Sequence, residues 1–339
     1  MTQPHPLQTP AEKASPEETI LELTLRPTQW DDYVGQDKVK QNLRLIIDAA
    51  RGRTEAPDHL LFYGQAGLGK TTLAYLIGKE LGATVHSTSG PALERAGDIA
   101  ALLSNLEPHD ILFIDEAHRL NKLVEEILYP AMESRRLHLI VGKGPSARTF
   151  SLDLPPFTII AATTRANLLS APLRSRFGAT FRLDYYRTED IQKILERSAR
   201  ILGVNMTEGA FNLLAGASRF TPRVANRLLK RARDYAQVHK HATIDEDVVK
   251  KTLELLDVDP LGLERADKEL IRIIIEKFNG GPVGVRALGA ALNEEPGTIE
   301  DIYEPFLMQL GFIERTSGGR VATRHAYKHL ALPQKPQLL

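Results

Sequence analysis

A phosphate-binding loop is the feature of this sequence with the clearest chemistry. Gly64, Gly69, Lys70 and Thr71 occupy every fixed position of the pattern G-x-x-x-x-G-K-[ST]. Glycines let the backbone wrap a phosphate, so that its N–H groups and the N-terminus of the following helix point at the negative charge. The lysine would reach the β- and γ-phosphates, and the threonine hydroxyl would hold Mg²⁺. The residues that we expect to bind a nucleoside triphosphate here are Gly67, Gly69, Lys70, Thr71 and Thr72.

The segments on both sides of this loop are the ones that such a loop needs. Residues 59–63 form a short apolar run, typical of a buried parallel strand. Residues 72–81 have helical periodicity, and Gly82 is placed to end that helix. The alternative is a glycine-rich turn that matches the pattern by chance, but such a turn needs neither the strand nor the helix. The sequence therefore predicts nucleoside triphosphate binding.

Two adjacent carboxylates follow a second apolar run. Asp115 and Glu116 come directly after residues 111–114, and the end of a strand in an open parallel sheet is where ligands bind. Asp115 would support the Mg²⁺ held by Thr71, while Glu116 would orient and deprotonate the attacking water. The alternative is that the pair only caps the next helix. Beside a phosphate loop, the pair indicates hydrolysis.

Two further polar positions are candidates for the same site. Thr164 follows the apolar run at residues 158–162 and could contact the γ-phosphate or the water, although it could equally be an ordinary helix cap. Arg176 follows a Pro-Leu turn, and its planar guanidinium suits a bidentate phosphate contact. Many surface arginines have no such role, and spacing alone does not decide between the two.

Composition excludes several classes of protein. The 339 residues include no cysteine, which excludes disulfides and thiolate metal sites. No apolar run reaches transmembrane length and the N-terminal residues lack a secretory pattern, so we expect a cytoplasmic protein. Lys and Arg together number 43, as do Asp and Glu, so overall charge does not indicate a polyanionic partner.

The pattern along the chain predicts an α/β fold with further domains after it. Residues 1–18 have the composition of a disordered segment. Residues 19–186 alternate apolar strand-like runs with helical periodicity, which predicts a parallel sheet covered by helices on both faces. Residues 187–257 contain only helical segments. Residues 258–339 contain three helical stretches and then a hairpin with strands at 312–315 and 320–323, an arrangement typical of a winged helix.

From residue 25 to about residue 330, the chain resembles the AAA+ ATPases, and in particular their bacterial Holliday-junction branch-migration motors. Besides the motifs above, the resemblance rests on residues 25–27, 33–36, 88–91, 118–121, 128–133, 142–148, 221–227, 280–284 and 298–305. It implies a large ATPase domain, a small helical lid and a DNA-binding winged helix. This sequence lacks two arginines that these motors often carry, one near residues 296–297 and one within residues 316–319.

The resemblance also implies roles for individual residues. ATP would be the nucleotide, with Thr164 as the sensor of its γ-phosphate. Arg176 would be the arginine finger that completes the site of a neighbouring subunit, so a closed ring, expected to be a hexamer, is implied. Arg223 would be a second sensor on the helical domain. The pocket around the adenine and phosphates would include Leu25, Arg26 and Tyr186.

A hairpin over residues 137–154 is the expected docking site for a partner. Its second strand alternates, with Phe150, Leu152 and Leu154 on one face. This face could simply pack on the core. The resemblance implies instead a dock for a RuvA-like protein that recognises the four-way junction, with Phe150 and Leu152 partly exposed. It also allows a junction resolvase as a further partner.

The last domain is divided by charge. Residues 261–310 carry 5 Lys or Arg against 9 Asp or Glu, whereas residues 311–339 carry 5 against 1. A basic hairpin suits contact with the phosphate backbone of duplex DNA without reading its sequence. The resemblance places DNA contacts at Arg315 and Arg320, while Arg324 and Lys328 could belong to a solvated tail.

Three functions are compatible with these observations. The first is a ring-forming ATPase that pumps duplex DNA to drive branch migration of Holliday junctions in recombination and repair. The second is a clamp-loader-like or remodelling AAA+ ATPase that acts on DNA. The third is a nucleotide switch without turnover, which would require neither Glu116 nor Arg176. The winged helix and the hairpin favour the first.

Overall fold

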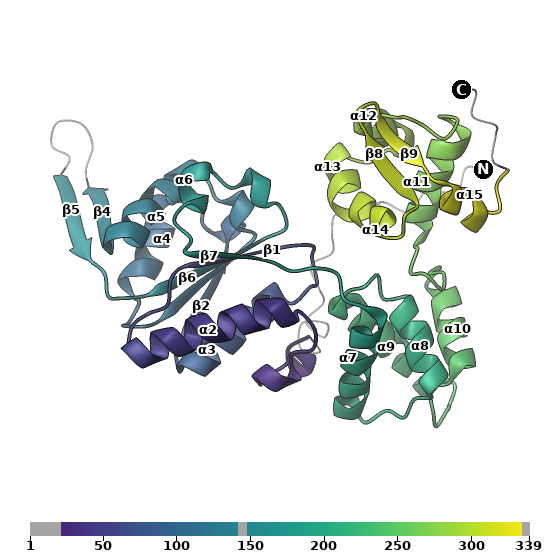
Figure 1. Ribbon diagram of the computed structural model, residues 1–339, viewed down its shortest axis with the longest axis horizontal. Helices are drawn as coiled ribbons and strands as arrows, with labels where there is room; N and C mark the ends of the chain where they lie inside the picture. Colours follow the sequence, from purple (N-terminus) through teal and green to yellow (C-terminus); the bar gives the residue numbers. More distant parts are fainter. Residues whose placement is uncertain (1–21, 142–147, 334–339) are drawn as a thin grey trace, which may run out of the picture.

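The computed structural model describes residues 22–141 and 148–333. A five-stranded parallel sheet is the centre of the first part of the chain, with strand order β2-β3-β6-β1-β7 (Figure 1). Its strands are β1 (Leu60–Tyr63), β2 (Val85–Ser89), β3 (Ile111–Asp115), β6 (Thr158–Thr163) and β7 (Ala179–Arg182).

Helices cover both faces of this sheet. Figure 1 shows α2 and α3 on one face and α4, α5 and α6 on the other. These helices are α2 (Asp37–Arg53), α3 (Lys70–Leu81), α4 (Ala96–Ser104), α5 (Lys122–Ser134) and α6 (Ala171–Arg174). Short 3₁₀ turns connect them at η1 (Trp30–Asp32), η2 (Gly90–Ala92), η3 (Ala117–Arg119) and η5 (Ala166–Leu168).

Each central strand contributes side chains to two cores. In β1, Leu60 and Phe62 belong to the cluster beneath α2 and α3, whereas Leu61 belongs to the cluster beneath α4 and α5. Strands β3 and β6 alternate in the same way. Because successive side chains point to opposite faces, a strand buried on both faces must be apolar throughout. The predicted doubly covered parallel sheet is confirmed.

A two-stranded antiparallel hairpin projects from this unit (Figure 1). It consists of β4 (Arg136–Val141) and β5 (Arg148–Asp153), with Leu137 opposite Leu152. The predicted hairpin is therefore present, although part of the motif at residues 142–148 lies outside the described residues, as does the segment 1–18.

The region after the sheet is helical, as predicted, and its helices are α7 (Thr188–Leu202), α8 (Glu208–Gly216), α9 (Pro222–Val238) and α10 (Glu246–Leu255). Thr207 caps α8 by accepting a hydrogen bond from the backbone of Ala210. Ile191 and Leu228 of these helices share one core with Tyr33 and Leu68 near the phosphate loop. The helical unit is therefore packed directly against the loop.

The last part of the chain is a winged helix. Its helices are α11 (Arg265–Glu276), α12 (Val285–Leu292), α13 (Pro296–Thr298), the π-helix η6 (Ile299–Tyr303), α14 (Glu304–Gln309) and α15 (Arg324–His329). The wing is the antiparallel pair β8 (Ile313–Thr316) and β9 (Gly319–Ala322), within one residue of the predicted strands. No helix within residues 22–141 and 148–333 is long and apolar enough to cross a membrane.

Candidate nucleotide site and basic wing

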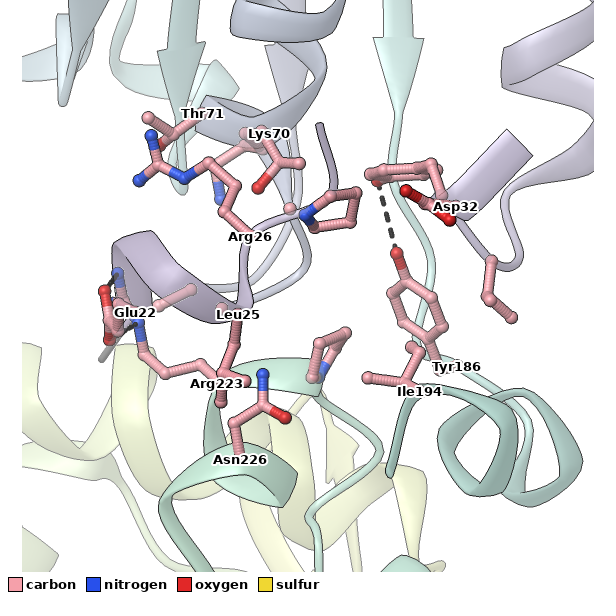
Figure 2. A pocket seen from close by; sticks show the side chains of 18 of the residues that line it. Glu22, Leu25, Arg26, Asp32, Lys70, Thr71, Tyr186, Ile194, Arg223 and Asn226 are labelled. Carbon is pink, nitrogen blue, oxygen red and sulfur yellow. Dashed lines mark hydrogen bonds and ion pairs between the residues drawn. The ribbon is translucent and has the colours of Figure 1, made fainter. Parts of the chain in front are cut away.

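A cavity of about 230 Å³ lies where the phosphate loop, the strand ends and the helical unit meet (Figure 2). Every predicted nucleotide-binding and catalytic residue except Arg176 lines it. Those residues are Leu25, Arg26, Gly67, Gly69, Lys70, Thr71, Thr72, Asp115, Glu116, Thr164, Tyr186 and Arg223. Sequence positions almost 200 residues apart thus converge on one pocket.

The phosphate loop has the conformation that its glycines allow. Gly69 has φ +94°, and a Cβ atom there would lie only 2.7 Å from the hydroxyl of Tyr33. Helix α3 starts directly after Gly69 and has no side-chain cap and no acidic residue in its first turn. Its backbone N–H groups and positive dipole end therefore face the pocket with no anionic side chain from the helix's own first turn. This end of the helix fits a phosphate.

Lys70 is the buried cation of this loop. Its Nζ donates hydrogen bonds of 2.8 Å to the backbone carbonyls of Gly64 and Gln65. Burial lowers the pKa of Lys70 to about 8, an effect that Asp115 opposes and Arg223 reinforces. A phosphate next to this amine would favour its charged form. The buried amine is thus a second feature that fits a nucleotide.

Two oxygen ligands suitable for Mg²⁺ lie together at the end of the loop. The Thr71 hydroxyl donates a 3.3 Å hydrogen bond to Oδ2 of Asp115. Among the described residues there is no cluster of three or more His, Asp or Glu side chains that could hold a metal alone. Because Mg²⁺ usually takes one or two protein ligands together with phosphate and water, this pair fits its role beside a nucleotide.

Glu116 begins the turn after β3 in a left-handed conformation, with φ +48°. Its side chain is half-exposed at the pocket and pairs with Arg119 at 3.0 Å. Its backbone N–H donates a 2.8 Å hydrogen bond to Oδ1 of Asp115, which fixes the Asp115 carboxylate relative to the backbone of this turn. The turn therefore presents one carboxylate to Thr71 and leaves the other to face water.

The neighbouring strand end carries Thr164, which is exposed in the pocket. The preceding residue, Thr163, is buried and its hydroxyl lies 3.0 Å from Nδ1 of His118. The backbone N–H of Arg165 donates to the same hydroxyl at 3.0 Å. Burial lowers the pKa of His118, so this imidazole is neutral at pH 7. The turns after β3 and β6 are thus tied together beside the pocket.

The helical unit closes the pocket from the other side. The Tyr186 hydroxyl donates to that of Tyr33 at 3.2 Å, and Tyr33 donates to the backbone carbonyl of Leu68 at 3.3 Å. Burial raises the pKa of Tyr186 to about 12, so it remains neutral. Arg223 lies over Gly67 and pairs with Glu22 at 2.9 Å (Figure 2). A movement of the helical unit would therefore move Arg223 relative to the phosphate loop.

Sequence reasoning missed part of this pocket. Arg197 donates a 2.8 Å hydrogen bond to the backbone carbonyl of Leu25, and its Nε lies 3.8 Å from Asp32. Asn226 also lines the pocket and accepts a 2.8 Å hydrogen bond from Ser198. Both side chains are polar residues on amphipathic helices, and no spacing in the sequence distinguishes them from solvent-facing neighbours.

Arg176 lies outside the pocket of its own chain. Its guanidinium is 4.5 Å from the centre of the Tyr129 ring and pairs with Glu133 at 2.8 Å. It also donates a 2.6 Å hydrogen bond to the backbone carbonyl of Pro172, and its side chain is 19% exposed. The structure therefore separates Arg176 from the loop that it would serve if it acted within one subunit.

The projecting hairpin has the predicted exposure. Phe150 and Leu152 are 55% and 46% exposed, whereas Leu154 at the base of the hairpin is buried. The alternative that this face packs on the core is thus wrong for the first two residues. Their role as a dock stays a prediction.

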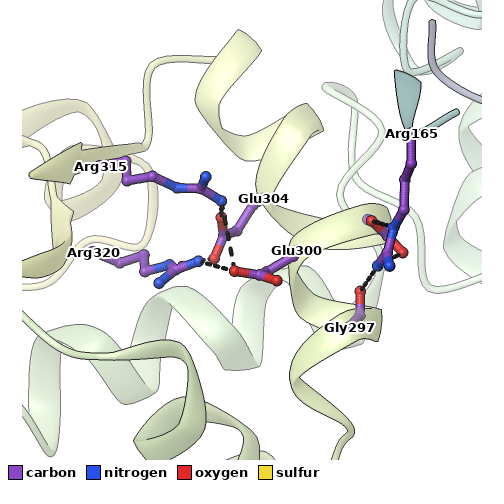
Figure 3. Close-up of polar contacts among 7 residues, drawn as sticks. Arg165, Gly297, Glu300, Glu304, Arg315 and Arg320 are labelled. Carbon is purple, nitrogen blue, oxygen red and sulfur yellow. Dashed lines mark hydrogen bonds and ion pairs between the residues drawn. The ribbon is translucent and has the colours of Figure 1, made fainter. Parts of the chain in front are cut away.

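Arg320 of the wing is buried and paired with carboxylates. This arginine is only 8% exposed, and its guanidinium binds Glu304 and, at 2.8 Å, Glu300 (Figure 3). Two carboxylates from the preceding helices thus neutralise its charge in this structure, and the predicted contact of Arg320 with DNA stays a prediction. Arg315 shares Glu304 but is half-exposed. Of the two predicted DNA contacts, only Arg315 is accessible.

A further arginine lies beside Arg315. Arg286, in the first turn of α12, lines a groove together with Arg315, Arg320, the carboxylate Glu300 and residues 316–319. It is exposed, and within residues 22–141 and 148–333 it forms no ion pair. Sequence reasoning missed it because it lies about 30 residues before the wing, inside the acidic half of the domain.

Comparisons with known proteins cover nearly the whole chain. The model of the Holliday junction DNA helicase RuvB P-loop domain matches residues 25–183, that of the RuvB AAA lid domain matches residues 186–259, and that of the RuvB C-terminal winged helix domain matches residues 260–331. The RuvB subunit of the branch migration complex from Rubrobacter xylanophilus is 56% identical over 328 residues, which are 97% of this chain and 92% of that protein.

Solved structures agree with these sequence comparisons. The Holliday junction branch migration motor RuvB of Thermotoga maritima is similar, with a TM-score of 0.84 and 46% identity, covering 91% of this chain and 99% of that one. An arginine-to-alanine variant of the same protein gives a TM-score of 0.83 at 46% identity, covering 91% and 98%. The predicted fold, a P-loop sheet domain followed by a lid and a winged helix, is confirmed.

Proposed function

Because this chain belongs to the RuvB family of AAA+ ATPases, we propose that it hydrolyses ATP to pump duplex DNA and so drives branch migration of Holliday junctions in recombination and repair. The observation that carries the proposal is the pocket, where a phosphate loop, two carboxylates and an arginine of the lid meet. A winged helix with an accessible arginine pair is attached to the same lid. Action on chromosomal DNA would place this activity in the cytoplasm.

Each residue of the pocket would have its own role in phosphoryl transfer. Lys70 and the N-terminus of α3 would hold the β- and γ-phosphates. Thr71 and Asp115 would hold Mg²⁺, which, when bound, neutralises charge on those phosphates. Glu116 would orient the attacking water and accept its proton, because it is the carboxylate that faces solvent. Thr164 would contact the γ-phosphate or this water from the neighbouring strand.

The lid and the N-terminal segment would hold the rest of the nucleotide. Leu25, Arg26 and Tyr186 line the same pocket, where Leu25 and Tyr186 offer apolar and aromatic surface that suits the adenine, and Arg26 extends toward Thr71 and Lys70 and suits the phosphates (Figure 2). Arg223 would sense the phosphates from the lid, exchanging its pair with Glu22 for the nucleotide. Loss of the γ-phosphate on hydrolysis would then cause the lid to rotate.

We further propose that the working form is a ring, expected to be a hexamer, in which Arg176 reaches the pocket of the next subunit. Its position outside its own pocket supports this, since a finger that acted within one chain would line that cavity. A head-to-tail interface that repeats around an axis produces such a ring. Exposed Phe150 and Leu152 support docking of a RuvA-like protein, whereas a junction resolvase as a partner rests on family resemblance alone.

For DNA contact, we propose Arg315 together with Arg286, and we assign Arg320 to holding the wing. Arg286→Ala and Arg315→Ala should each weaken binding of duplex DNA of any sequence and lower the salt dependence of the binding constant by about one unit. Fluorescence anisotropy titrations at several salt concentrations measure both quantities. Arg272→Ala, which removes an exposed arginine of α11, is the matched control. Unchanged affinity in both wing variants would remove this groove from the DNA interface.

The proposed activity is tested by ATP hydrolysis and by movement of a junction. We expect duplex DNA to stimulate the ATPase, and a synthetic four-way junction to be separated into duplex products when ATP and RuvA are both present. Hydrolysis that is indifferent to DNA would favour a remodelling ATPase of another substrate. Nucleotide binding without hydrolysis under any of these conditions would favour a switch.

A further inference from the structure

An ion pair connects the ATPase domain directly to the winged helix. Arg165, the residue after Thr164, donates from Nε to Oδ1 of Asp301 at 2.5 Å, and its Nη2 binds the second carboxylate oxygen. Nη2 also lies 3.5 Å from the backbone carbonyl of Gly297 (Figure 3). A bidentate guanidinium–carboxylate pair fixes direction as well as distance.

The segment that carries Asp301 also holds the wing. Asp301 belongs to the π-helix η6, a type of turn that is rare and frequently found at functional sites. Glu300 of the same turn binds Arg320, and Glu304, one residue beyond it, binds both Arg320 and Arg315. One short helical segment therefore binds the end of β6 on one side and the arginines of the wing on the other (Figure 3).

The other end of this connection reaches the nucleotide pocket. The backbone N–H of Arg165 donates to the hydroxyl of Thr163, and Thr164 between them lines the pocket. A restraint on the Arg165 side chain is thus a restraint on the turn that positions Thr164. The two paired side chains are 30% and 39% exposed, so the pair is accessible enough to form and break during a working cycle.

We propose that Asp301 is a positioning residue for ATP hydrolysis, which acts from the DNA-binding domain through Arg165 on Thr164. The ion pairs of this segment explain how DNA binding would change its position. Three carboxylates of this segment balance Arg165, Arg315 and Arg320, so a DNA phosphate that attracts Arg315 leaves Glu304 and Glu300 underneutralised. The segment then has a new preferred position, and Asp301 moves with it. The inference rests on the proposed ATPase and on DNA binding by the wing.

Asp301→Asn tests this role, because it removes the charge while keeping the size of the side chain and lies outside the nucleotide pocket. We expect kcat for ATP hydrolysis at saturating duplex DNA to fall roughly fivefold or more, the usual lower range of coupling between sites. KM for ATP, DNA affinity in the absence of nucleotide and the melting temperature should stay close to wild type. Asp301→Glu, which keeps the charge, should restore part of the stimulation. Glu295→Gln, an exposed carboxylate near the same segment, is the matched control.

A second measurement uses the reciprocity of coupling. In the wild type, a non-hydrolysable ATP analogue should change the affinity for duplex DNA, and Asp301→Asn should abolish most of that change. If wild-type ATPase responds to DNA and Asp301→Asn responds equally, the inference is overturned while the proposed function stands. If wild-type ATPase ignores DNA, it is the proposed function that has failed. An equal loss in Glu295→Gln would also overturn the role of Asp301, because any lost carboxylate would then suffice.

Discussion

Arg176→Ala should lower kcat for ATP hydrolysis by about 10³-fold or more, the usual range for the loss of an arginine finger, with ATP affinity nearly unchanged. The reason for this separation is position. Arg176 does not line the nucleotide pocket of its own chain, so its loss leaves the loop, the carboxylates and the lid in place. Steady-state hydrolysis and equilibrium binding of a fluorescent ATP analogue measure the two effects.

The contacts of Arg176 show what assembly must change. In the single chain its guanidinium is stacked on Tyr129, paired with Glu133 and largely covered. To stabilise charge on a neighbour's γ-phosphate, it must exchange Glu133 for that phosphate. Hydrolysis per subunit should accordingly fall when the wild-type protein is diluted until the ring dissociates.

Mixed rings test whether Arg176 acts across subunits. Lys70→Ala subunits have a defective pocket and an intact finger, while Arg176→Ala subunits have the opposite defect. Random mixing in equal amounts should restore about a quarter of the sites in a head-to-tail ring. Arg174→Ala, which removes an exposed arginine from the same turn, is the control. Mixtures that stay as inactive as their components, or an equal loss in the control, would contradict the assignment.

Strand burial explains which elements were predictable. Strands β1, β3 and β6 occupy the centre of the sheet, and burial on both faces makes them continuous apolar runs. Strands β2 and β7 form the two edges and were not predicted. Residues 85–89 are mostly polar and half-buried, and Thr180 and Arg182 of β7 are exposed. An edge strand needs less apolar surface, so its pattern resembles that of a loop.

At the functional sites, a different physical cause limits what the sequence can predict. Every residue of the phosphate loop could be predicted, because its chemistry depends on neighbours in the sequence. The state of Arg320 could not, because it depends on carboxylates 16 and 20 residues away that tertiary packing brings to it. Arg165 and Asp301 are 136 residues apart, and no local pattern joins them. Charge counts described the wing as basic without showing which charges were already paired.

Glu116→Gln should lower kcat by about 10²- to 10⁴-fold, the range expected for the loss of a general base. The amide keeps the size of the side chain but cannot accept the proton of the attacking water. Asp115 cannot readily replace it, because its two oxygens already accept from Thr71 and from the backbone N–H of Glu116. ATP and duplex DNA should still bind, so the variant should accumulate on DNA in its ATP-bound form.

A matched control for Glu116→Gln is available in the neighbouring helix. Glu126→Gln removes an exposed carboxylate from nearby α5 and should hydrolyse ATP at the wild-type rate. Single-turnover hydrolysis with radiolabelled ATP separates chemistry from product release. If Glu116→Gln retained wild-type single-turnover rates, another group would have to accept the proton. The half-exposed carboxylate would then serve only as the partner of Arg119, and the difference in surroundings between Asp115 and Glu116 would have no catalytic meaning.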